Sequence, residues 1–429
     1  MKQQAGFYGW KLLVAVFVIT AINSGFTYYG GNIMNSHMAV EMNLDRKSLG
    51  LAFATYGLCI GLVVPLVGYW VTRWGARRAL AGGALSSAIG ALAMATLVND
   101  MTGVLIAYGL VMGIGSSLGG LLPAQTLMTH WFRARLAMVL TIMLTGTLCG
   151  GFIAAPLFEK VITTFNGNWR AGWVLMAAAS GVSCLLALLF VRNRPADLGQ
   201  LQDGGVAVPA AVAGQAATVP GVYKTDVEWS FRDTVRHPTL WMLAAGTICF
   251  LSAFGMMVGH GVVHFKDLGH DAATAALFLG LLPLAGLGGK AVVATLGDRV
   301  EPRFIWGGAM AVMGIGLALG VNATSVAALY GAALLLGVGN AAAYPCMVTL
   351  VANYFGKAAY ASLMGVMLLI GALSTSAGPL AAGVVFDRFG SYLFAFYPAA
   401  ALCLLGGVMI LFARPPRPAL AGLAHCPTA

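Results

Sequence analysis

The sequence predicts an all-α membrane protein with twelve transmembrane helices in two similar halves of six. Of its 429 residues, 59% are hydrophobic and 9% are charged, whereas a soluble domain carries about 25% charged residues. Twelve apolar stretches are each long enough to cross a bilayer, which takes about 20 helical residues. Lysine and arginine gather in alternate loops between these stretches, which is the pattern of a multi-pass protein with a defined orientation.

The first six apolar stretches cover residues 11–33, 49–71, 79–98, 103–127, 137–158 and 170–191. The first of them begins at Lys11, after Lys2, and runs past Tyr28, which is too long for the apolar core of a signal peptide. We therefore expect it to be retained as the first helix. The other six stretches cover residues 239–263, 273–296, 304–322, 326–350, 360–383 and 391–413.

One long polar segment, rich in Ala, Val, Gly, Pro and Asp, separates the two sets of six. This composition is typical of a linker. We therefore expect an N-terminal six-helix half over residues 1–191, a cytoplasmic linker over 192–237 and a C-terminal six-helix half over 238–429.

The distribution of positive charge predicts the orientation. With a cytoplasmic N-terminus, 17 of the 24 lysines and arginines fall on the cytoplasmic side, six fall on the outer side, and Lys290 lies within the eighth stretch. The positive-inside rule then places both termini in the cytoplasm of a protein of the inner (plasma) membrane. Because the basic residues lie in short loops between apolar spans, the net charge of +10 does not indicate a nucleic-acid partner.

The two halves repeat each other. The segment from Gly68 to Arg78, after the second stretch, recurs 226 positions later, from Ala294 onwards, after the eighth stretch. The fourth and tenth stretches share a tyrosine, a Gly-x-Gly, a proline and a closing aromatic pair: Tyr108, Gly113, Gly115, Pro123 and Trp131–Phe132 against Tyr330, Gly337, Gly339, Pro345 and Tyr354–Phe355.

These residues carry a family resemblance. Over nearly its whole length the chain resembles the transporters of the major facilitator superfamily. The loop G-x4-R-x-G-x-R-R resembles their cytoplasmic gating motif, with Thr72 where an aspartate is usual. The segments RNRPADLG from Arg192, WSFRDTVRHPTLW from Trp229 and WFRARLAM from Trp131 resemble the bacterial monocarboxylate and oxalate/formate branch. The resemblance implies the major facilitator fold and alternating access to a site between the halves, near the middle of the membrane.

Lys290 is the principal candidate for binding a substrate. Lys11 and Arg170 begin their stretches, but Lys290 lies well inside its own, about 12 Å of helix before Asp298. Its counterpart in the first half is Val64, so the repeat does not require the charge. A buried cation without a partner favours an anionic ligand, and the resemblance implies a cation here that pairs with a substrate carboxylate. A structural lysine that extends toward the headgroups is the alternative.

Polar residues in the seventh and tenth stretches are further candidates. Asn340 and Tyr344 are four residues apart and share a helix face, where they could orient a carboxylate or hydroxyl. His260 could line the cavity or carry a proton, although two polar residues near the membrane interface would also explain His260 and His264. In the first stretch, Asn23, Thr27 and Tyr28 are candidates because first helices of this superfamily line the central cavity, while an aromatic belt would equally explain Tyr28.

The sequence leaves two possibilities for what drives transport, proton coupling and anion exchange. Proton-coupled relatives carry an aspartate four residues before the cation of this helix, and here that position is Gly286. No predicted span contains Asp or Glu. A coupling proton would use His260, Lys290 or the substrate carboxyl, and exchange of one anion for another is the alternative.

A second group lies at the cytoplasmic edge. Arg73, Arg77, Arg78, Asp298 and Arg299 occupy repeated positions, too close to the edge to bind substrate. Charge pairs there could latch the halves in the outward-facing state, although the positive-inside rule alone would explain the arginines.

These observations predict a secondary active transporter for a small organic anion, such as the monocarboxylates lactate or pyruvate, working by proton symport or anion exchange. No metal site, cofactor or enzyme activity is expected, because the spans lack a Cys/His cluster and a nucleophile–base pair. Two alternatives stay open: a carrier or exporter of a neutral or amphipathic small molecule, such as a vitamin or drug, and a membrane sensor of the same fold that does not transport.

Overall fold

The computed structural model describes residues 6–42, 46–205 and 222–416, and it is helical almost throughout. The middle of the predicted linker and the basic residues Lys2 and Arg417 lie outside this part. The helices of the first half are α1 (Gly9–Thr20), η1 (Ala21–Gly30), α2 (Gly31–Glu41), α3 (Arg46–Trp74), α4 (Ala76–Thr96), α5 (Met101–Val104), η2 (Leu105–Met112), α6 (Gly113–Leu118), α7 (Leu121–Trp131), α8 (Leu136–Thr164) and α9 (Trp169–Phe190).

Short helices η3 (Pro195–Leu198), η4 (Gln202–Gly205) and α10 (Phe231–Arg236) follow α9. The second half then comprises α11 (Pro238–Asp267), α12 (Ala272–Leu296), α13 (Pro302–Val321), α14 (Val326–Phe355), α15 (Tyr360–Phe389) and α16 (Leu393–Leu411). Several helices extend one or two turns beyond the predicted apolar stretches, because their ends continue into the polar zones.

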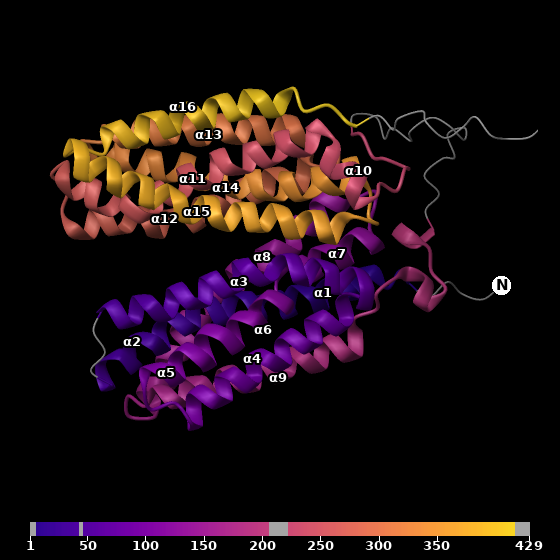
Figure 1. Cartoon of the computed structure of the whole chain (residues 1–429), viewed down its shortest axis with the longest axis horizontal. Helices are drawn as coiled ribbons and strands as arrows, with labels where there is room; N and C mark the ends of the chain where they lie inside the picture. The colour runs from indigo at the N-terminus through magenta and orange to yellow at the C-terminus, as the bar shows by residue number, and fades with distance from the viewer. Residues whose placement is uncertain (1–5, 43–45, 206–221, 417–429) are drawn as a thin grey trace, which may run out of the picture.

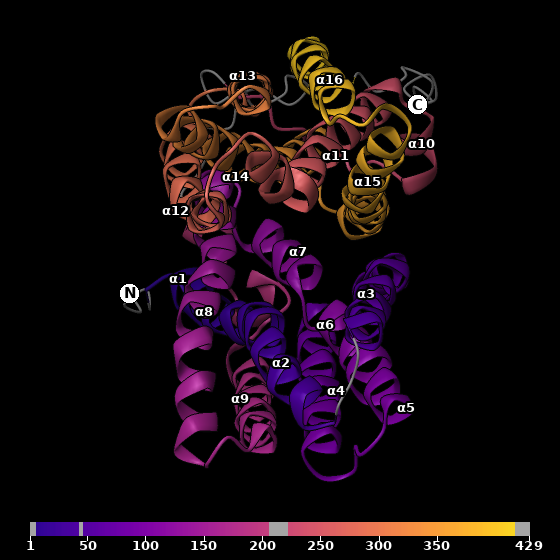
Figure 2. The same ribbon diagram turned by 90° about the vertical axis from the view of Figure 1, so that its left-hand side faces the viewer.

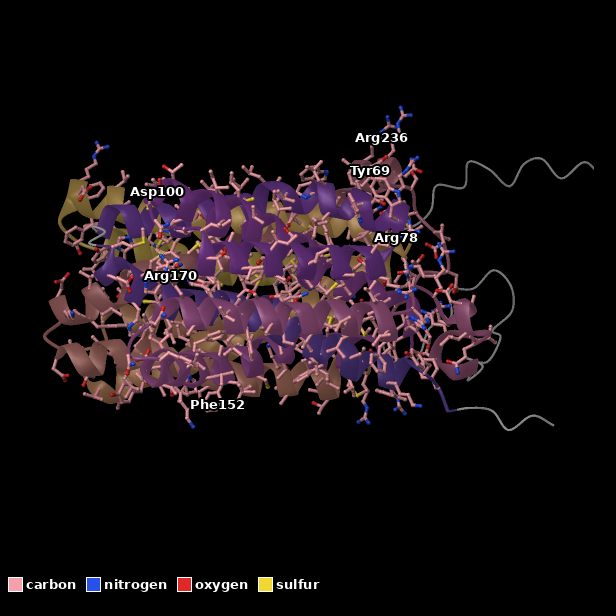
Figure 3. The ribbon with its side chains drawn as sticks, turned by 90° about the horizontal axis from the view of Figure 1, so that it is seen from below. Tyr69, Arg78, Asp100, Phe152, Arg170 and Arg236 are labelled. Carbon is pink, nitrogen blue, oxygen red and sulfur yellow. The ribbon has the colours of Figure 1, made fainter. Side chains whose placement is uncertain are left out.

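Twelve membrane-spanning segments are present in the described part of the chain, judged by length and apolar composition. Large apolar side chains such as Phe152, 85% exposed, project from the sides of the bundle. Figure 3 shows Arg78 and Arg236 at one end and Asp100 and Arg170 toward the other, with Phe152 on the side between them. An apolar belt between two charged ends is the surface that a bilayer selects, and the predicted fold class is confirmed.

Two spans are irregular, which the apolar pattern did not reveal. The first span changes to π-helix over η1, and the fourth is interrupted between α6 and α7 at Gly119 and Gly120. Asn23 of η1 donates from Nδ2 to the carbonyl oxygen of Gly119 over 2.9 Å. Backbone groups released by a break need partners where no water reaches them, so Asn23 stabilises the interruption.

The two halves form two layers, which Figure 1 shows as the indigo-to-magenta helices below and the orange-to-yellow helices above. The layers meet at the end where α3, α7, α9, α12, α14 and α16 terminate, and the described parts of the linker lie there as well. We call this the linker end and the opposite one the far end. Viewed from the far end, α8 meets α12 on one side of the bundle and α3 meets α15 on the other (Figure 2).

Small residues allow the halves to close at the linker end. A methyl group on Gly68 of α3 would lie 2.6 Å from the Ala361 carbonyl oxygen of α15. One on Gly297, just after α12, would lie 2.7 Å from the Ala137 methyl of α8. Glycines of this kind let membrane helices approach closely enough to pack without large side chains.

Close packing within the second half places the candidate residues of α12 and α14 together. A methyl group on Gly289 would come within 2.2 Å of the Val338 carbonyl oxygen, and one on Gly337 within 2.4 Å of the Leu282 carbonyl oxygen. The two backbones therefore touch beside Lys290.

Replacing Gly289 with alanine should force α12 away from α14 and lower the melting temperature of the purified protein. Gly288→Ala is the matched control, because a methyl there meets only the Val338 side chain, at 3.8 Å. Both changes have the same effect on helix propensity. Equal melting temperatures for the two variants, measured by thermal unfolding in detergent, would show that this backbone contact is not required.

Candidate functional site

A cavity of about 440 Å³ lies between the two halves. Helices α7 and α8 of the first half and α11, α12 and α14 of the second contribute its walls. Most lining side chains are apolar, and the polar ones are Thr147, Lys290, Asn340 and Tyr344. Three of the seven residues predicted to bind substrate, Lys290, Asn340 and Tyr344, are thus brought to one cavity.

Lys290 reaches across the boundary between the halves. Its Nζ donates to the Leu144 carbonyl oxygen of α8 over 3.0 Å. The described residues that line the cavity include no carboxylate, so its positive charge is solvated there by a backbone dipole. A carbonyl is a weak substitute for a counter-ion inside a membrane, which leaves the ammonium able to bind an anion.

Tyr344 lines the same cavity as Lys290, and its hydroxyl is bonded from the first half. Gln125 of α7 donates from Nε2 to the Tyr344 hydroxyl over 3.2 Å, and the Gln125 Oε1 is buried with no partner among the described residues. Sequence reasoning did not identify Gln125 or Thr147. Gln125 could have been found because a glutamine inside an apolar stretch is unusual. Thr147 could not, because it is one of several threonines in α8 and nothing in the sequence distinguishes it.

His260 lies elsewhere. Its Nδ1 is 3.0 Å from the Tyr392 hydroxyl and its Nε2 is 2.9 Å from the Pro379 carbonyl oxygen. It is not among the residues that line the cavity. Both ring nitrogens are satisfied within the second half, so the arrangement matches a structural role better than contact with substrate. His264 similarly contacts the Val321 carbonyl oxygen, at 3.0 Å.

The three candidates of the first span also lie outside this cavity. Asn23 and Thr27 are buried within the first half, where Asn23 bonds to Gly119 and the Thr27 hydroxyl lies 3.9 Å from the Met176 sulfur. Tyr28 is 57% exposed. The structure therefore separates these residues from Lys290. In the described part of the chain, no three His, Cys, Asp or Glu side chains gather as a metal site would require.

Gly286 lines the cavity one turn before Lys290. A Cβ at this position would lie 3.1 Å from the Ala341 methyl. Position 286 is thus a point of close contact between α12 and α14 in this chain.

At the linker end, Asp298 connects the halves. From the loop after α12 its carboxylate accepts the backbone N–H groups of Ala137 and Met138, in the first turn of α8, each at 2.9 Å. A carboxylate at a helix N-terminus satisfies free N–H groups and complements the helix dipole. Burial raises the pKa of Asp298, and these N–H groups oppose the rise.

The predicted gating arginines make other contacts than the expected charge pairs. Arg77 donates to the Leu188 carbonyl oxygen within the first half, and Arg73 lies over the ring of Trp74 at 5.8 Å. Arg78 and Arg299 are exposed. Among the five predicted gating residues, only Asp298 is described in contact with the opposite half.

The end of the linker is held mainly by the second half. Glu301 accepts the backbone N–H of Tyr223 over 2.7 Å and the Tyr354 hydroxyl over 2.8 Å. Thr225 donates its N–H to the Asn353 carbonyl oxygen over 2.8 Å. This segment therefore lies against α13 and α14.

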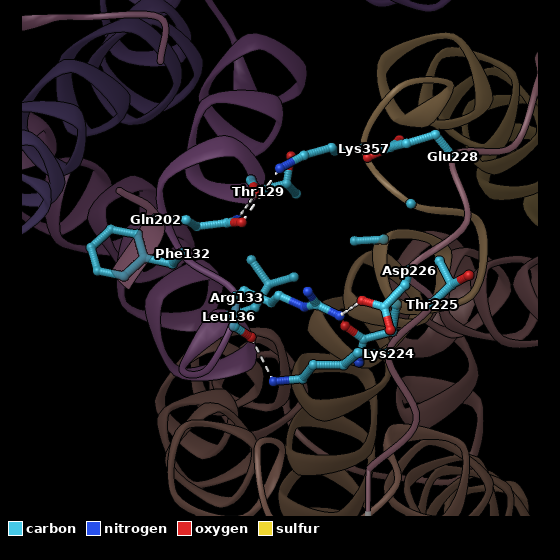
Figure 4. Close-up of a pocket in the computed structure, with 13 residues that line it drawn as sticks. Thr129, Phe132, Arg133, Leu136, Gln202, Lys224, Thr225, Asp226, Glu228 and Lys357 are labelled. Carbon is cyan, nitrogen blue, oxygen red and sulfur yellow. Dashed lines mark hydrogen bonds and ion pairs between the residues drawn. The ribbon is translucent and has the colours of Figure 1, made fainter. Parts of the chain in front are cut away.

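Lys224 joins the same segment to the first half. It is 4% exposed, and its Nζ donates to the carbonyl oxygens of Arg133 and Ala134, between α7 and α8, at 2.5 and 3.0 Å. Asp226 pairs with the Arg133 guanidinium. Figure 4 shows both contacts crossing a cavity of about 260 Å³ that residues of the two halves and the linker line together. Burial lowers the pKa of Lys224.

Asp203, at the start of the linker, binds the same connection between α7 and α8 through its N–H groups. Its carboxylate accepts the N–H groups of Arg133 and Ala134 at 3.0 and 2.9 Å. The linker thus binds the α7–α8 connection in two ways: Asp203 accepts hydrogen bonds from the N–H groups of this connection, and Lys224 donates to its carbonyl oxygens. Sequence reasoning treated this segment as a tether, because contacts to backbone atoms leave no pattern in side-chain spacing.

Asp298→Asn should weaken closure at the linker end, because a neutral amide is a poorer partner for the N–H groups of α8. The loss of a helix cap corresponds to roughly a three- to tenfold change in population. A cysteine introduced for Thr129, which lines the cavity of Figure 4, should then react faster with maleimide. Asp197→Asn is the control, because Asp197 bonds locally, to the Arg194 N–H. Unchanged labelling in Asp298→Asn would exclude a latch.

The amino-acid sequence matches the Major Facilitator Superfamily over residues 16–311 and 266–424. Similar proteins include monocarboxylate transporter 13 of Bos taurus, 26% identical over 69% of this chain and 63% of that protein. The gentisate transporter of Corynebacterium glutamicum is 26% identical over 80% of this chain and 73% of that protein. The probable sulfoacetate transporter of Cupriavidus necator is 24% identical over 61% and 59%. The match thus spans less than two thirds of the Bos taurus and Cupriavidus necator proteins.

Solved structures share the fold. A bacterial homologue of the iron transporter ferroportin, in an outward-facing state, superimposes with a TM-score of 0.71 at 16% identity, over 95% of this chain and 99% of that one. The E. coli fucose:proton symporter gives 0.69 at 14% identity, over 94% and 98%. At such identities the likeness concerns the fold alone. With a family match that covers most of its length, this chain belongs to the Major Facilitator Superfamily, a family of transporters and not of enzymes.

Proposed function

We propose that this protein is a secondary active transporter that moves a small organic monoanion, such as the monocarboxylates lactate or pyruvate, by alternating access. One observation carries the proposal: the Lys290 ammonium faces a cavity between the halves whose described lining contains no carboxylate. A cation in that position lacks a fixed counter-ion, and a substrate carboxylate would supply one.

On binding, the Lys290 ammonium would exchange a backbone oxygen partner for a substrate oxygen. The substrate carboxylate would replace or join the Leu144 carbonyl as the acceptor for Lys290, and the Tyr344 hydroxyl, positioned by Gln125, could donate to its second oxygen. Charge-assisted hydrogen bonds of this kind are stronger than neutral ones. A single cation neutralises one negative charge, which favours a monoanion over a dicarboxylate.

The related proteins support an anionic substrate of the monocarboxylate type. Those named for a substrate include monocarboxylate, gentisate and sulfoacetate transporters, and all of these compounds carry a carboxylate. We accordingly assign the chain to the monocarboxylate and oxalate/formate branch. The proposed anion would bind at the cavity, and Asn23, Thr27, Tyr28 and His260 would contact it only in another conformation.

The conformation described would be the outward-facing one, with the linker end on the cytoplasmic side of the inner (plasma) membrane and both termini inside. Asp298 and Lys224 would hold the linker end shut, and opening there would break their contacts with the α7–α8 region. Arg73, Arg77, Arg78 and Arg299 would then serve orientation and local packing more than latching.

Coupling would be proton symport or anion exchange. With a glycine at position 286 and no acid among the described cavity residues, a fixed carboxylate relay beside Lys290 is unavailable. Substrate-carried protons or exchange with an internal anion both fit this chemistry.

Lys290→Ala should reduce uptake of labelled lactate or pyruvate into proteoliposomes at least tenfold, because truncating one partner of a buried charge pair costs about 2–5 kcal/mol. Lys290→Arg should keep a substantial part of the wild-type uptake, because the positive charge is retained. The control is Lys160→Ala, an exposed lysine near the far end of α8. Normal uptake in Lys290→Ala would favour a neutral substrate, and no flux of any anion in the wild type would favour a sensor.

A further inference from the structure

The cavity of Figure 4, about 260 Å³ in volume, is enclosed by three parts of the chain. The first half contributes the end of α7, the start of α8 and the turn between them. The linker contributes both of its described ends, and the second half contributes the end of α14 and the loop after it. None of the described residues that line this cavity lines the cavity of Lys290. A ligand bound here would therefore contact both halves and the linker at once, outside the site proposed for the substrate.

The acidic groups that line this cavity already have partners. Two carboxylates, Asp226 and Glu228, are among the described lining residues. Asp226 pairs with the Arg133 guanidinium, and Glu228 accepts the backbone N–H of Ala358 over 2.8 Å. A metal cation or an amine would have to compete with these partners for the carboxylates.

Several hydrogen-bond donors that line the same cavity are not fully used. Asn353 is 4% exposed, and its Nδ2 is buried without a partner among the described residues. The exposed Lys357 ammonium has one described hydrogen bond, to the Gln202 Oε1 over 3.4 Å, which is long for such a bond. Lys224 donates to two carbonyl oxygens but forms no ion pair in the described part of the chain.

The combination of free donors and occupied acceptors favours an anion. Three cations, Arg133, Lys224 and Lys357, line the cavity against two carboxylates, which leaves one positive charge in excess. The positive-inside rule explains why basic residues collect at this end, but it does not account for a buried amide N–H without a partner in the same cavity. A water molecule would satisfy that amide. A small oxyanion would satisfy it and also compensate the excess charge.

We propose that this cavity binds a small oxyanion, of the phosphate or carboxylate type, which accepts hydrogen bonds from Asn353 and Lys357 and is attracted by the charge of Lys224. Because the anion contacts both halves, it binds only while the linker end is closed. A ligand that binds one conformation shifts the population toward it, so the bound anion slows opening at this end. The site itself does not depend on the proposed function, whereas its effect as an inhibitor of transport rests on that function.

Binding of inorganic phosphate and of lactate to the purified Lys290→Ala variant tests the site. This variant lacks the cation of the central cavity, so the anion binding that remains involves another site. We expect its melting temperature to rise with phosphate concentration while sodium chloride keeps the ionic strength constant. A rise with lactate as well would identify the transported type of anion as a ligand, and a rise with phosphate alone would identify a separate oxyanion.

Further variants in the Lys290→Ala background identify the residues. Lys357→Gln should weaken phosphate binding roughly tenfold, because a charge-assisted hydrogen bond is lost, and Lys357→Arg should restore most of the affinity. Asn353→Leu should weaken phosphate binding roughly three- to tenfold. Lys160→Gln, at an exposed lysine near the far end of α8, is the matched control and should leave the binding unchanged. The exposed position of Lys357 keeps the test decisive where Asn353→Leu lowers the stability of the fold.

Transport measures the consequence of binding. In proteoliposomes of the protein with Lys290 intact, phosphate on both sides of the membrane should slow lactate uptake about threefold or more, because it stabilises the closed linker end. Lys357→Gln should abolish this inhibition. Inhibition that persists in Lys357→Gln would show that phosphate competes at the central cavity, and it would overturn the regulatory role.

The outcomes separate this inference from the proposed function. The site is wrong if neither anion raises the melting temperature of Lys290→Ala, or if Lys357→Gln leaves the rise unchanged. Lactate uptake that depends on Lys290 would still support the proposed function in that case. Uptake that is independent of Lys290 would instead contradict the proposed function and leave phosphate binding at Lys357 standing.

Discussion

A positive charge inside a membrane span must be solvated by the protein, and the way this chain solvates Lys290 relates its cavity to its two halves. The acceptor is a backbone carbonyl of α8, which belongs to the opposite half. Lys290 therefore faces the space in which a ligand can bind and also contacts an element that has to move relative to α12 during alternating access. An anion that displaced the Leu144 carbonyl would change a contact between the halves in the act of binding, and under the proposed function this one group would couple binding to movement.

The position of that charge depends on close backbone contact elsewhere. Gly289 and Gly337 bring α12 and α14 together, so that Lys290 and Tyr344, from different helices, line the same cavity. Gln125 then holds the Tyr344 hydroxyl from α7. The apolar walls lower the local polarity, which strengthens each remaining electrostatic contact.

The linker end shows how the internal repeat has diverged. Asp298 and Thr72 occupy equivalent positions, and Asp298 caps α8 whereas Thr72 donates to the Gly68 carbonyl oxygen of its own helix. Before α15, the counterpart of α8, the N–H of Ala358 is accepted over 2.8 Å by Glu228 of the linker and not by Thr72 of the opposite half. Closure is therefore asymmetric: α8 is held by Asp298, and the turn before it is held by Asp203 and Lys224. Charged side chains bonded to backbone groups carry this closure, with Arg133 and Asp226 adding an ion pair.

The twelve spans, the repeat and the unusual position of Lys290 inside a span could be deduced from the sequence, because a bilayer imposes a length and an apolar composition that side chains record directly. Helix periodicity also placed Asn340 and Tyr344 on one face. Tertiary structure alone decided which polar residues meet: it turned His260 toward Tyr392 and Pro379, used Asn23 to stabilise a broken helix, and added Gln125 and Thr147 to the cavity. The contacts of Asp298, Asp203 and Lys224 at the linker end were equally hidden, since their partners are main-chain N–H and carbonyl groups that nearly every residue possesses. Contacts between side chains and backbone depend on how helices pack, and packing across two halves is not recorded in the spacing of residues along either one.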